Sequence, residues 1–288
     1  MLSKQQVAAF QIKILDWYEL HQRDLPWRKI RDPYSILVSE VMSQQTQLSR
    51  VVPKYEAWMQ RFPTVRDLAK ASIAEVLQFW SGLGYNRRAL NLKKTAEIIT
   101  TNYRGTFPKT EKELMSLPGI GQYTARAVLC FAFDVQVAVV DTNVRKVIMT
   151  QILNSDYSES GLSLSDDKSQ FGEEKIDEKM FEEIATQLLP YGEAYKWNQA
   201  LMDYAAAVLK KEKIPIPKQS KFIGSHRYYR GQILKVLLQK KKVAMKDLGL
   251  LIKKDYTVSE KEWLEKLLEE LVREGFVKRE SKTVSLAS

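Results

Sequence analysis

Cysteine and histidine are almost absent from this sequence, whose 288 residues contain one cysteine, Cys130, and two histidines, His21 and His226. A single cysteine excludes a disulfide framework and a four-cysteine metal or iron–sulfur site within one chain. The two histidines are far apart in the sequence, which argues against a histidine-based metal site. We therefore expect no metal and no iron–sulfur cofactor. Cys130 lies in the apolar run 128–133 and is expected to be a small buried side chain.

Long apolar runs are missing as well. No run reaches the ~18 residues that a membrane-spanning helix needs, and residues 1–6 lack the apolar core of a signal peptide. These absences predict a cytoplasmic protein with no membrane partner. The hydrophobic content of 44% is normal for a globular protein, and a chain of this length can bury a sizeable core in two or three domains.

Basic and acidic side chains are equal in number over most of the chain. Residues 1–209 carry 25 basic and 25 acidic side chains, whereas residues 210–288 carry 20 basic and 10 acidic ones. All of the net charge of +10 therefore belongs to the last 79 residues. Such asymmetry is typical of an appended module that faces a polyanion, although a solvated lysine-rich surface is the common alternative.

Strand-like alternation is scarce before residue 270, and almost every segment has helical spacing, which predicts an all-α layout with short links. Helices are predicted at 7–20, 35–46, 51–61, 64–69, 73–80, 86–102, 111–116, 122–132 and 142–152, and later at 228–240, 244–253 and 259–274. Residues 180–211 are also predicted to be helical, with a break at 190–192. Residues 154–178 hold eight acidic and two basic side chains and are predicted to be an exposed insertion. Residues 275–286 are predicted to form two short strands around a turn.

The segment 117–127 has the pattern of a helix-hairpin-helix. Gly119 and Gly121 permit a tight turn between the predicted helices 111–116 and 122–132. The second helix begins at Gln122, so its free N–H groups and positive dipole end form a phosphate site. Such a hairpin grips the DNA backbone without reading bases. An ordinary helical hairpin with a glycine turn is the competing interpretation.

Two carboxylates are candidates for chemistry. Glu40 lies among apolar residues on a predicted helix, where burial would raise its pKa and suit it to general acid catalysis, although a surface glutamate is the ordinary interpretation. Asp141 precedes a helix and has the pattern of an N-cap, but it could also face a cationic transition state. Asn143 could orient Asp141, and Tyr123 could line the same pocket.

Two further segments have features of DNA contact. In Gly84–Arg88 an aromatic side chain, Tyr85, follows a glycine turn and precedes two cations, Arg87 and Arg88. Such an aromatic can enter between bases, and the arginines can hold phosphates. A core tyrosine with surface arginines is the alternative. Gln45 lies in a Gln-Gln-Thr segment at the end of the Glu40 helix.

Taken in order, these segments resemble the adenine DNA glycosylases of the MutY family, within the helix-hairpin-helix glycosylase superfamily. The segments that carry the resemblance are Arg23–Arg28, Asp32–Tyr34, Ser39–Met42, Gln44–Thr46, Arg61–Thr64, Gly82–Tyr85 and Val140–Val144. The match covers about residues 7–153 with nearly unbroken spacing, and 180–209 more weakly. Several motifs in the correct order are specific, whereas each alone is weak.

The resemblance implies a two-lobed all-α glycosylase fold. Residues 29–135 would form a six-helix barrel that contains the hairpin, and residues 1–28 and 136–212 a second helical lobe. DNA would lie between the lobes with its target base flipped out of the stack. Residues 213–221 would be a linker and 222–288 a basic module similar to a winged helix. A monovalent cation at the hairpin remains a candidate ligand.

The resemblance also implies roles for individual residues. Glu40 matches the acid that protonates adenine, and Asp141 the carboxylate that stabilises the sugar cation, with Tyr123 and Asn143 in support. DNA contact would involve the remaining candidates, which are Arg23, Arg28, Gln45, Tyr85, Arg87, Arg88, Gly119, Gly121 and Gln122. Among these, Gln45 and Tyr85 match the residues that wedge into the duplex.

This sequence departs from the family pattern in three places. The four cysteines that usually follow the helix matching 198–209 are absent. The usual C-terminal reader of 8-oxoguanine, which resembles a Nudix fold, is replaced by the shorter basic module. In that module Phe222, Ser225 and His226 resemble a Phe-Ser-His reading loop only weakly. Thr142 stands where adenine glycosylases typically have glycine and endonuclease III relatives often have threonine.

The sequence thus predicts a monofunctional DNA glycosylase of base excision repair. It would hydrolyse the N-glycosidic bond of adenine mispaired with 8-oxoguanine or guanine, acting as a monomer on mismatched or damaged double-stranded DNA. A mismatch thymine or uracil glycosylase of the same fold is the first alternative. A non-catalytic damage-binding protein is the second, although pure binding requires neither Glu40 nor Asp141.

Overall fold

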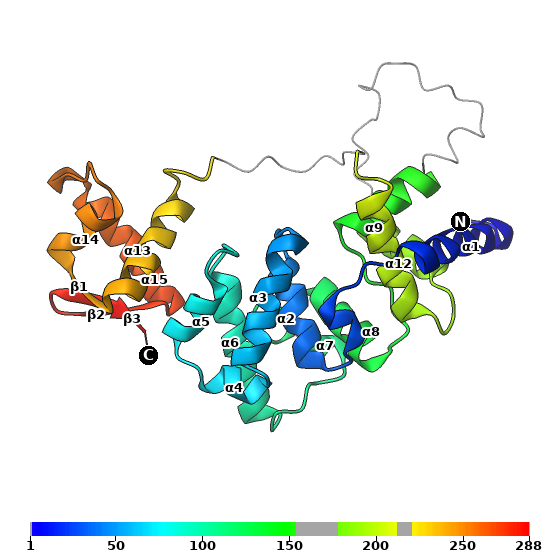
Figure 1. Ribbon diagram of the computed structural model, residues 1–288, viewed down its shortest axis with the longest axis horizontal. Coiled ribbons are helices and arrows are strands. Elements are labelled where there is room, and N and C mark those ends of the chain that lie inside the picture. The colour runs from blue at the N-terminus through cyan, green and yellow to red at the C-terminus, as the bar shows by residue number, and fades with distance from the viewer. Residues whose placement is uncertain (1, 154–177, 212–220, 288) are drawn as a thin grey trace, which may run out of the picture. The chain divides into compact units, whose positions relative to one another are not determined.

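The computed structural model describes residues 2–153, 178–211 and 221–287, and these are largely helical (Figure 1). The elements up to residue 153 are α1 (Lys4–His21), α2 (Pro33–Ser43), α3 (Leu48–Arg61), α4 (Val65–Lys70), α5 (Ile73–Trp80), α6 (Arg87–Asn102), α7 (Glu111–Met115), α8 (Gln122–Phe133) and α9 (Thr142–Ile148). The later elements are α11 (Glu178–Leu188), α12 (Ala194–Ala207), α13 (His226–Lys240), β1 (Lys242–Ala244), α14 (Met245–Ile252), α15 (Lys261–Glu274), β2 (Val277–Glu280) and β3 (Thr283–Leu286). The all-α prediction with a small C-terminal sheet is confirmed.

Short polar sequences start several of these helices. At the start of α5, the Ser72 hydroxyl accepts a hydrogen bond from the Glu75 backbone N–H, and the Glu75 carboxylate accepts one from the Ser72 N–H. This reciprocal pair satisfies two N–H groups that have no partner within the helix. The same arrangement begins α1 at Ser3 and α4 at Thr64. These caps explain why the helix starts could be predicted to within a few residues.

Within the described ranges the contacts divide the chain into two compact units. One unit comprises residues 1–40, 108–116 and 120–216, and the other comprises residues 41–107, 117–119 and 217–288. The unit boundaries differ from those of the predicted lobes, which stay a prediction. The predicted insertion 154–178 and linker 213–221 fall almost wholly outside the described residues.

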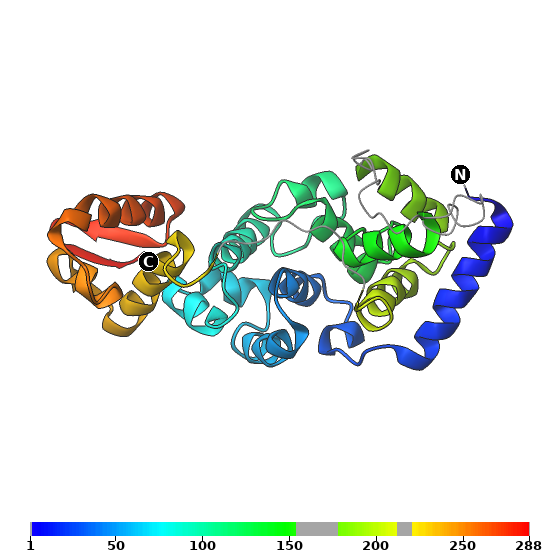
Figure 2. The same ribbon diagram turned by 90° about the horizontal axis from the view of Figure 1, so that it is seen from above.

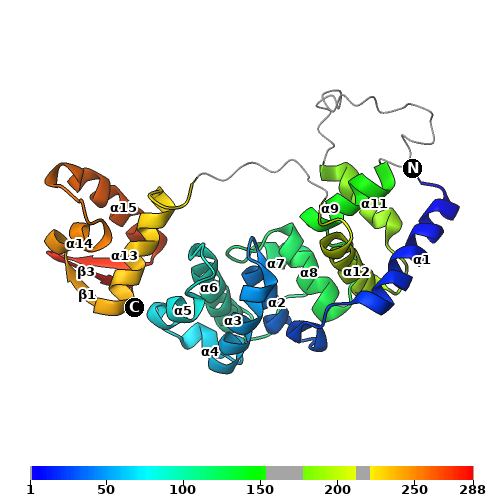
Figure 3. The ribbon, with the colours of Figure 1, turned by 45° about the horizontal axis from the view of Figure 1, so that its top comes forward.

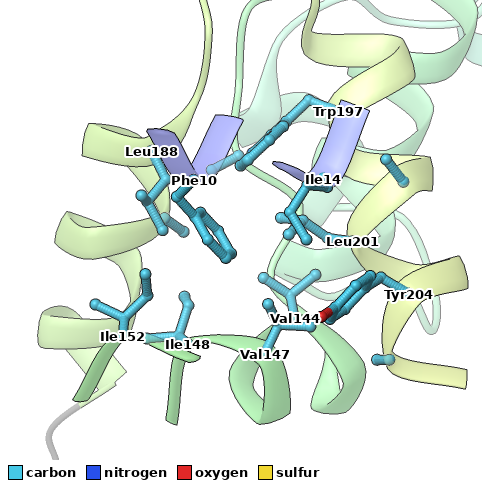
Figure 4. Packing of buried hydrophobic residues seen from close by; sticks show 14 of the residues in the cluster. Phe10, Ile14, Val144, Val147, Ile148, Ile152, Leu188, Trp197, Leu201 and Tyr204 are labelled. Atoms are coloured by element: carbon cyan, nitrogen blue, oxygen red, sulfur yellow. The ribbon is translucent and has the colours of Figure 1, made fainter. Parts of the chain in front are cut away.

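The first unit is built around the contact of α1 with α12. Phe10, Ile14 and Tyr18 recur every four residues, which places them on one face of α1. That face is buried against Trp197 and Leu201 of α12 (Figure 4). α9 and α11 complete the cluster, and Figure 3 shows α11 beside α1. Burial of each large apolar side chain contributes roughly 1.5–3 kcal/mol to the free energy of unfolding.

In the second unit, α3 to α6 pack around aromatic side chains. The ring of Trp58 meets Phe62 and Trp80 edge-on, with centroid separations of 4.9 and 5.7 Å. All three side chains are fully buried. This packing fixes Trp80 at the end of α5, and its indole N–H donates a 2.8 Å hydrogen bond to the Gly84 carbonyl in the glycine turn, 82–84, that follows.

The C-terminal module, residues 222–287, combines three helices with a three-stranded antiparallel sheet of order β1-β3-β2 (Figure 2). The hairpin of β2 and β3 was predicted, but β1 was not. β1 follows a lysine-rich helix end and has only three residues, so it gives no alternating pattern. Helices followed by a hairpin form a winged-helix arrangement. No helix in the described parts of the chain is long and apolar enough to cross a membrane.

Candidate active site

Glu40 projects from α2 in a partly buried position and accepts a 2.7 Å hydrogen bond at Oε2 from the hydroxyl of Tyr123. Burial raises the pKa of Glu40 to about 7, opposed by the Tyr123 hydrogen bond and raised further by the charge of Asp141. This carboxyl therefore holds its proton to a higher pH than an ordinary glutamate does. The structure gives Glu40 the property that a general acid needs.

Tyr123 is in the first turn of α8, directly after the glycine hairpin. Burial raises the pKa of Tyr123 well above its ordinary value, and the neighbouring Glu40 and Asp141 add to the effect. Its hydroxyl therefore keeps its proton and stays a donor toward Glu40.

Asp141 is the N-cap of α9, so the ordinary role predicted for it is confirmed. Its Oδ1 accepts a 2.8 Å hydrogen bond from the Val144 N–H, and its Oδ2 accepts a 2.7 Å bond from the Asn143 amide. Burial raises the pKa of Asp141, whereas these hydrogen bonds act in the opposite direction. Both carboxylate oxygens thus receive donors that favour the charged form.

Asn198 of α12 holds the segment that leads to Asp141. Its Oδ1 accepts a 2.8 Å hydrogen bond from the Val139 N–H, and its amide donates to the Val137 carbonyl at 3.0 Å. The same amide contacts the sulfur of Cys130, which is fully buried as predicted. Asn198 is 1% exposed, so these bonds form away from water and fix the approach to the N-cap.

Arg28 was expected to contact DNA, which stays a prediction, and the structure gives it an internal role. Its guanidinium donates two 2.7 Å hydrogen bonds to the two carboxylate oxygens of Asp203, whose side chain is 1% exposed. Arg23, also expected at the DNA, donates to the same carboxylate through Nε at 2.7 Å and its backbone N–H at 2.9 Å. Removing one arginine would leave the buried negative charge of Asp203 only partly balanced, which is costly. The pairing therefore stabilises the folded chain. Arg28 also lowers the pKa of Glu40 through its positive charge.

The hairpin that precedes α8 has the predicted glycine geometry. Gly119 has φ of +77°, and a Cβ there would lie 2.7 Å from the amide nitrogen of Asn91. Gly121 is the N-cap of α8, and a Cβ there would meet nothing within 4 Å. Gly119 is therefore required by the turn, whereas Gly121 and Gln122 are exposed at the start of the helix. Open backbone at a helix N-terminus suits a phosphate.

Gln45 and Tyr85 share an unusual backbone conformation. Their φ values are +55° and +46°, in the left-handed region that side chains other than glycine rarely adopt. Such conformations persist only where the surroundings hold them. Tyr85 is also 42% exposed although its ring is large and apolar. We name residues 44–46 and 83–85, which carry these two side chains, the wedge loops.

Arg88 holds the wedge loops together, an internal role in addition to the phosphate contact that stays a prediction. Its guanidinium donates to the carbonyl of Gln44 at 2.7 Å in one loop and to that of Leu83 at 3.1 Å in the other. It also donates to the Val41 carbonyl at 2.6 Å and to the Thr46 hydroxyl at 3.2 Å. Burial lowers the pKa of Arg88 to about 10, so it remains charged at neutral pH.

The remaining residues predicted to contact DNA differ in their exposure and in their contacts within the protein. The Arg87 side chain is 70% exposed and lies 3.9 Å from Glu274. Ser225 caps α13, accepting from the Tyr228 N–H and donating to the Phe222 carbonyl. The His226 ring is 3.2 Å from Glu270, and Phe222 is 58% exposed. These contacts give Ser225 a local structural role and leave the reading-loop hypothesis a prediction.

Sequence reasoning did not single out Asp203 or Asn198. Both are polar residues in the otherwise apolar stretch 197–205, which is the signal that could have identified them. A buried polar side chain requires partners, but the sequence does not say which ones.

Part of this chain is similar to a known protein family. Residues 38–159 match the family model described as HhH-GPD superfamily base excision DNA repair protein. This part of the chain is similar to the HhH-GPD superfamily. It includes Glu40, Tyr123, Asp141 and Asn143.

Curated adenine DNA glycosylases are among the similar sequences. That of Mycolicibacterium smegmatis is 50% identical over 138 residues, which cover 48% of this chain and 47% of that protein. The mouse protein is 36% identical over 241 residues, covering 79% of this chain and 44% of that protein. The chain thus spans about half the length of these curated relatives.

Solved structures agree on the fold. A thermostable thymine-DNA glycosylase has a TM-score of 0.60 and 29% identity, covering 78% of this chain and 94% of that one. A non-covalent endonuclease III–DNA complex has a TM-score of 0.55 and 24% identity, covering 71% of this chain and 86% of that one.

Proposed function

We propose that this protein is a monofunctional DNA glycosylase that removes adenine mispaired with 8-oxoguanine or guanine. The observation that carries the proposal is the pair of carboxylates around Tyr123. Glu40 has a pKa of about 7, whereas Asp141 receives hydrogen bonds at both oxygens. One proton donor and one anion, set apart by their environments, form the two-carboxylate arrangement that glycoside hydrolysis uses.

In the proposed reaction, Glu40 donates its proton to a ring nitrogen of the flipped-out adenine. The bond between C1′ and the base then breaks, and its electron pair leaves with the protonated base. The Asp141 carboxylate stabilises the positive charge that develops on the sugar. Water adds to C1′ and returns a proton to the Glu40 carboxylate, which restores the starting state.

Tyr123 supports the monofunctional assignment. Strand cleavage through a Schiff base needs an amine that attacks C1′, and the resemblance to endonuclease III implies a lysine at the matching position in those relatives. Here a phenol occupies that position and donates to Glu40. Tyr123 therefore positions and tunes the acid instead of forming a covalent bond to DNA.

The family implies an iron–sulfur cluster, and the residues of this chain do not fit one. A cubane cluster takes four thiolates, whereas the chain has one cysteine, whose buried sulfur contacts Asn198. No proposed step depends on a cluster. Among the described residues no group of three or more histidine, cysteine or acidic side chains could hold a metal ion.

Thymine or uracil mismatch excision is the second candidate function. The similarity to a thymine-DNA glycosylase over 78% of this chain favours it, as does Thr142 beside Asp141. The catalytic pair alone does not separate the two, because both reactions need a stabilised sugar cation.

A duplex panel separates them. We expect single-turnover base release from A:8-oxoguanine and A:G duplexes and none from T:G or U:G duplexes. Glu40→Gln serves as the matched control, since it keeps the shape of the side chain and removes the acid. Release of thymine or uracil without adenine would replace the proposal with the second candidate. Tight mismatch binding without release from any duplex would favour a damage-binding protein.

A further inference from the structure

The C-terminal module packs against helices of the second unit through a shared apolar core. Ile73 and Leu77 of α5 and Leu90 of α6 belong to the same buried cluster as Ile233 and Leu237 of α13. α13 also contacts α5 directly. The module is therefore held by buried apolar surface, which orders the side chains at its edge.

Polar contacts surround this packed region. The Lys94 ammonium donates to the Glu274 carbonyl at 3.2 Å, and the Glu274 carboxylate accepts from Arg230 at 2.7 Å. Glu274 is the last residue of α15, the helix that would enter a DNA groove in a helix-turn-helix type of module. α15 is rich in glutamate, which phosphates would repel. Its end is instead used for protein contacts.

At the same edge, Arg227 of α13 reaches Tyr85. Its Nη1 donates a 3.1 Å hydrogen bond to the tyrosine hydroxyl, and its guanidinium lies 5.9 Å from the ring centroid. Arg88 already fixes the backbone of this loop through the carbonyls of Leu83 and Gly84. The strained, exposed Tyr85 is thus held at its backbone by one arginine and at its hydroxyl by another.

We propose that Arg227 is a positioning residue that holds the Tyr85 ring ready to enter the duplex. The C-terminal module would then take part in extruding the target base, in addition to attracting DNA by charge. A side chain that is already ordered loses less conformational freedom on insertion, which corresponds to roughly a twofold to tenfold gain in the extrusion step. This inference rests on the proposed function, because it assumes that Tyr85 enters DNA during base excision.

A double-mutant cycle on Arg227→Met and Tyr85→Phe tests the contact. Tyr85→Phe keeps a ring that can stack and removes the hydroxyl that Arg227 contacts. The readouts are the fluorescence rise of 2-aminopurine placed beside the mismatched adenine, single-turnover adenine release, the Kd for the duplex and the Tm. We expect each single variant to slow extrusion roughly threefold to tenfold with little change in Tm, and the double variant to be no slower than either.

Two further variants separate the contact of Arg227 with Tyr85 from the general effect of its positive charge. Arg273→Met removes one positive charge from an exposed position in the same module and should leave extrusion unchanged. Arg227→Lys retains a donor and should restore part of the rate. Additive losses in the double variant, equal effects of Arg227→Met and Arg273→Met, or faster extrusion in Arg227→Met would each overturn the inference. If the wild type neither extrudes nor releases adenine, the proposed function fails and the inference with it.

Discussion

At the scale of single residues, the proposed chemistry depends on a carboxyl whose pKa is raised to about 7. Burial and the charge of Asp141 both raise the pKa of Glu40, and only Tyr123 and Arg28 act against them. The surroundings of Glu40 therefore favour its role as the acid, and the hydrogen bonds that Asp141 receives favour its role as the anion.

Glu40→Gln should reduce adenine release by at least ~10²–10⁴-fold, the usual loss when a general acid is removed, while mismatch affinity changes little. In the wild type, release should fall as pH rises through about 7, because Glu40 loses its proton there. Single-turnover rates from pH 5.5 to 9 measure both effects. A Glu40→Gln rate within threefold of the wild type would contradict the acid assignment.

The same variant should alter the pH dependence of stability. The folded-state pKa of Glu40, about 7, lies above its ordinary value of 4.5, so the folded state binds the proton more tightly than the unfolded state. The free energy of unfolding therefore falls as pH rises from 4.5 to 7, and Glu40→Gln removes this loss. We expect Glu40→Gln to be more stable than the wild type at pH 8 by about 1–3 kcal/mol, and the difference to shrink at pH 5. Denaturant unfolding at the two pH values tests this, and a variant less stable at pH 8 would refute it.

At the scale of elements, the guanidinium of Arg88 joins the two wedge loops. Arg88→Met keeps the length of the side chain and removes the donors to both loops. Loss of hydrogen bonds from a buried charged group typically costs about 1.5–3 kcal/mol, so we expect a lower Tm. Extrusion of the target base should also be slower than in the wild type, because Gln45 and Tyr85 lose the hydrogen bonds that support their left-handed backbone. Arg87→Met, on the neighbouring exposed residue, is the control and should leave the Tm unchanged.

The helices could be predicted from local sequence, whereas the internal contacts of the arginines could not. α5 begins at Ile73 and ends at Trp80 as predicted, because Ser72 and Glu75 form its cap within four residues of chain. Arg28 and Arg88 lie in motifs typical of DNA contact, but their partners are distant in sequence or are backbone carbonyls. A buried pairing between residues 28 and 203 leaves no local pattern. The same limit hid β1, which gains its partner only when β3 forms.

At the scale of the whole molecule, +6 of the net charge of +10 belongs to residues 222–288, whose module shares core residues with α5 and α6. Deleting the module would expose Ile73, Leu77 and Leu90, so charge variants are the better test of its DNA binding. Lys241→Gln with Lys282→Gln removes two exposed charges at the sheet edge. We expect the log–log salt slope of DNA binding to flatten by about 0.9 for each phosphate that the variant no longer neutralises, equally on A:8-oxoguanine and A:G duplexes. Lys4→Gln with Lys70→Gln is the control outside the module. An equal change in its salt slope would show that the module has no special role in binding DNA.

The composition predicts a protein without bound iron. Four thiolates cannot come from one cysteine, so the purified protein should be colourless, with no iron–sulfur absorption in the visible range. Metal analysis by mass spectrometry measures this directly. One iron–sulfur cluster per chain, after removal of loosely bound metal, would contradict the expectation.

The pairing of the N-terminal helix with α12 has a consequence for the order of events on the ribosome. The apolar face of α1, with Phe10 and Ile14, meets its partners only when Trp197 and Leu201 have been synthesised. At roughly 5–20 residues per second, that wait lasts on the order of ten to forty seconds. During this interval Arg23 and Arg28 also lack Asp203, so the start of the chain cannot settle. We therefore expect α1 to remain without its packing partners during this interval, although α3 to α6 can already pack.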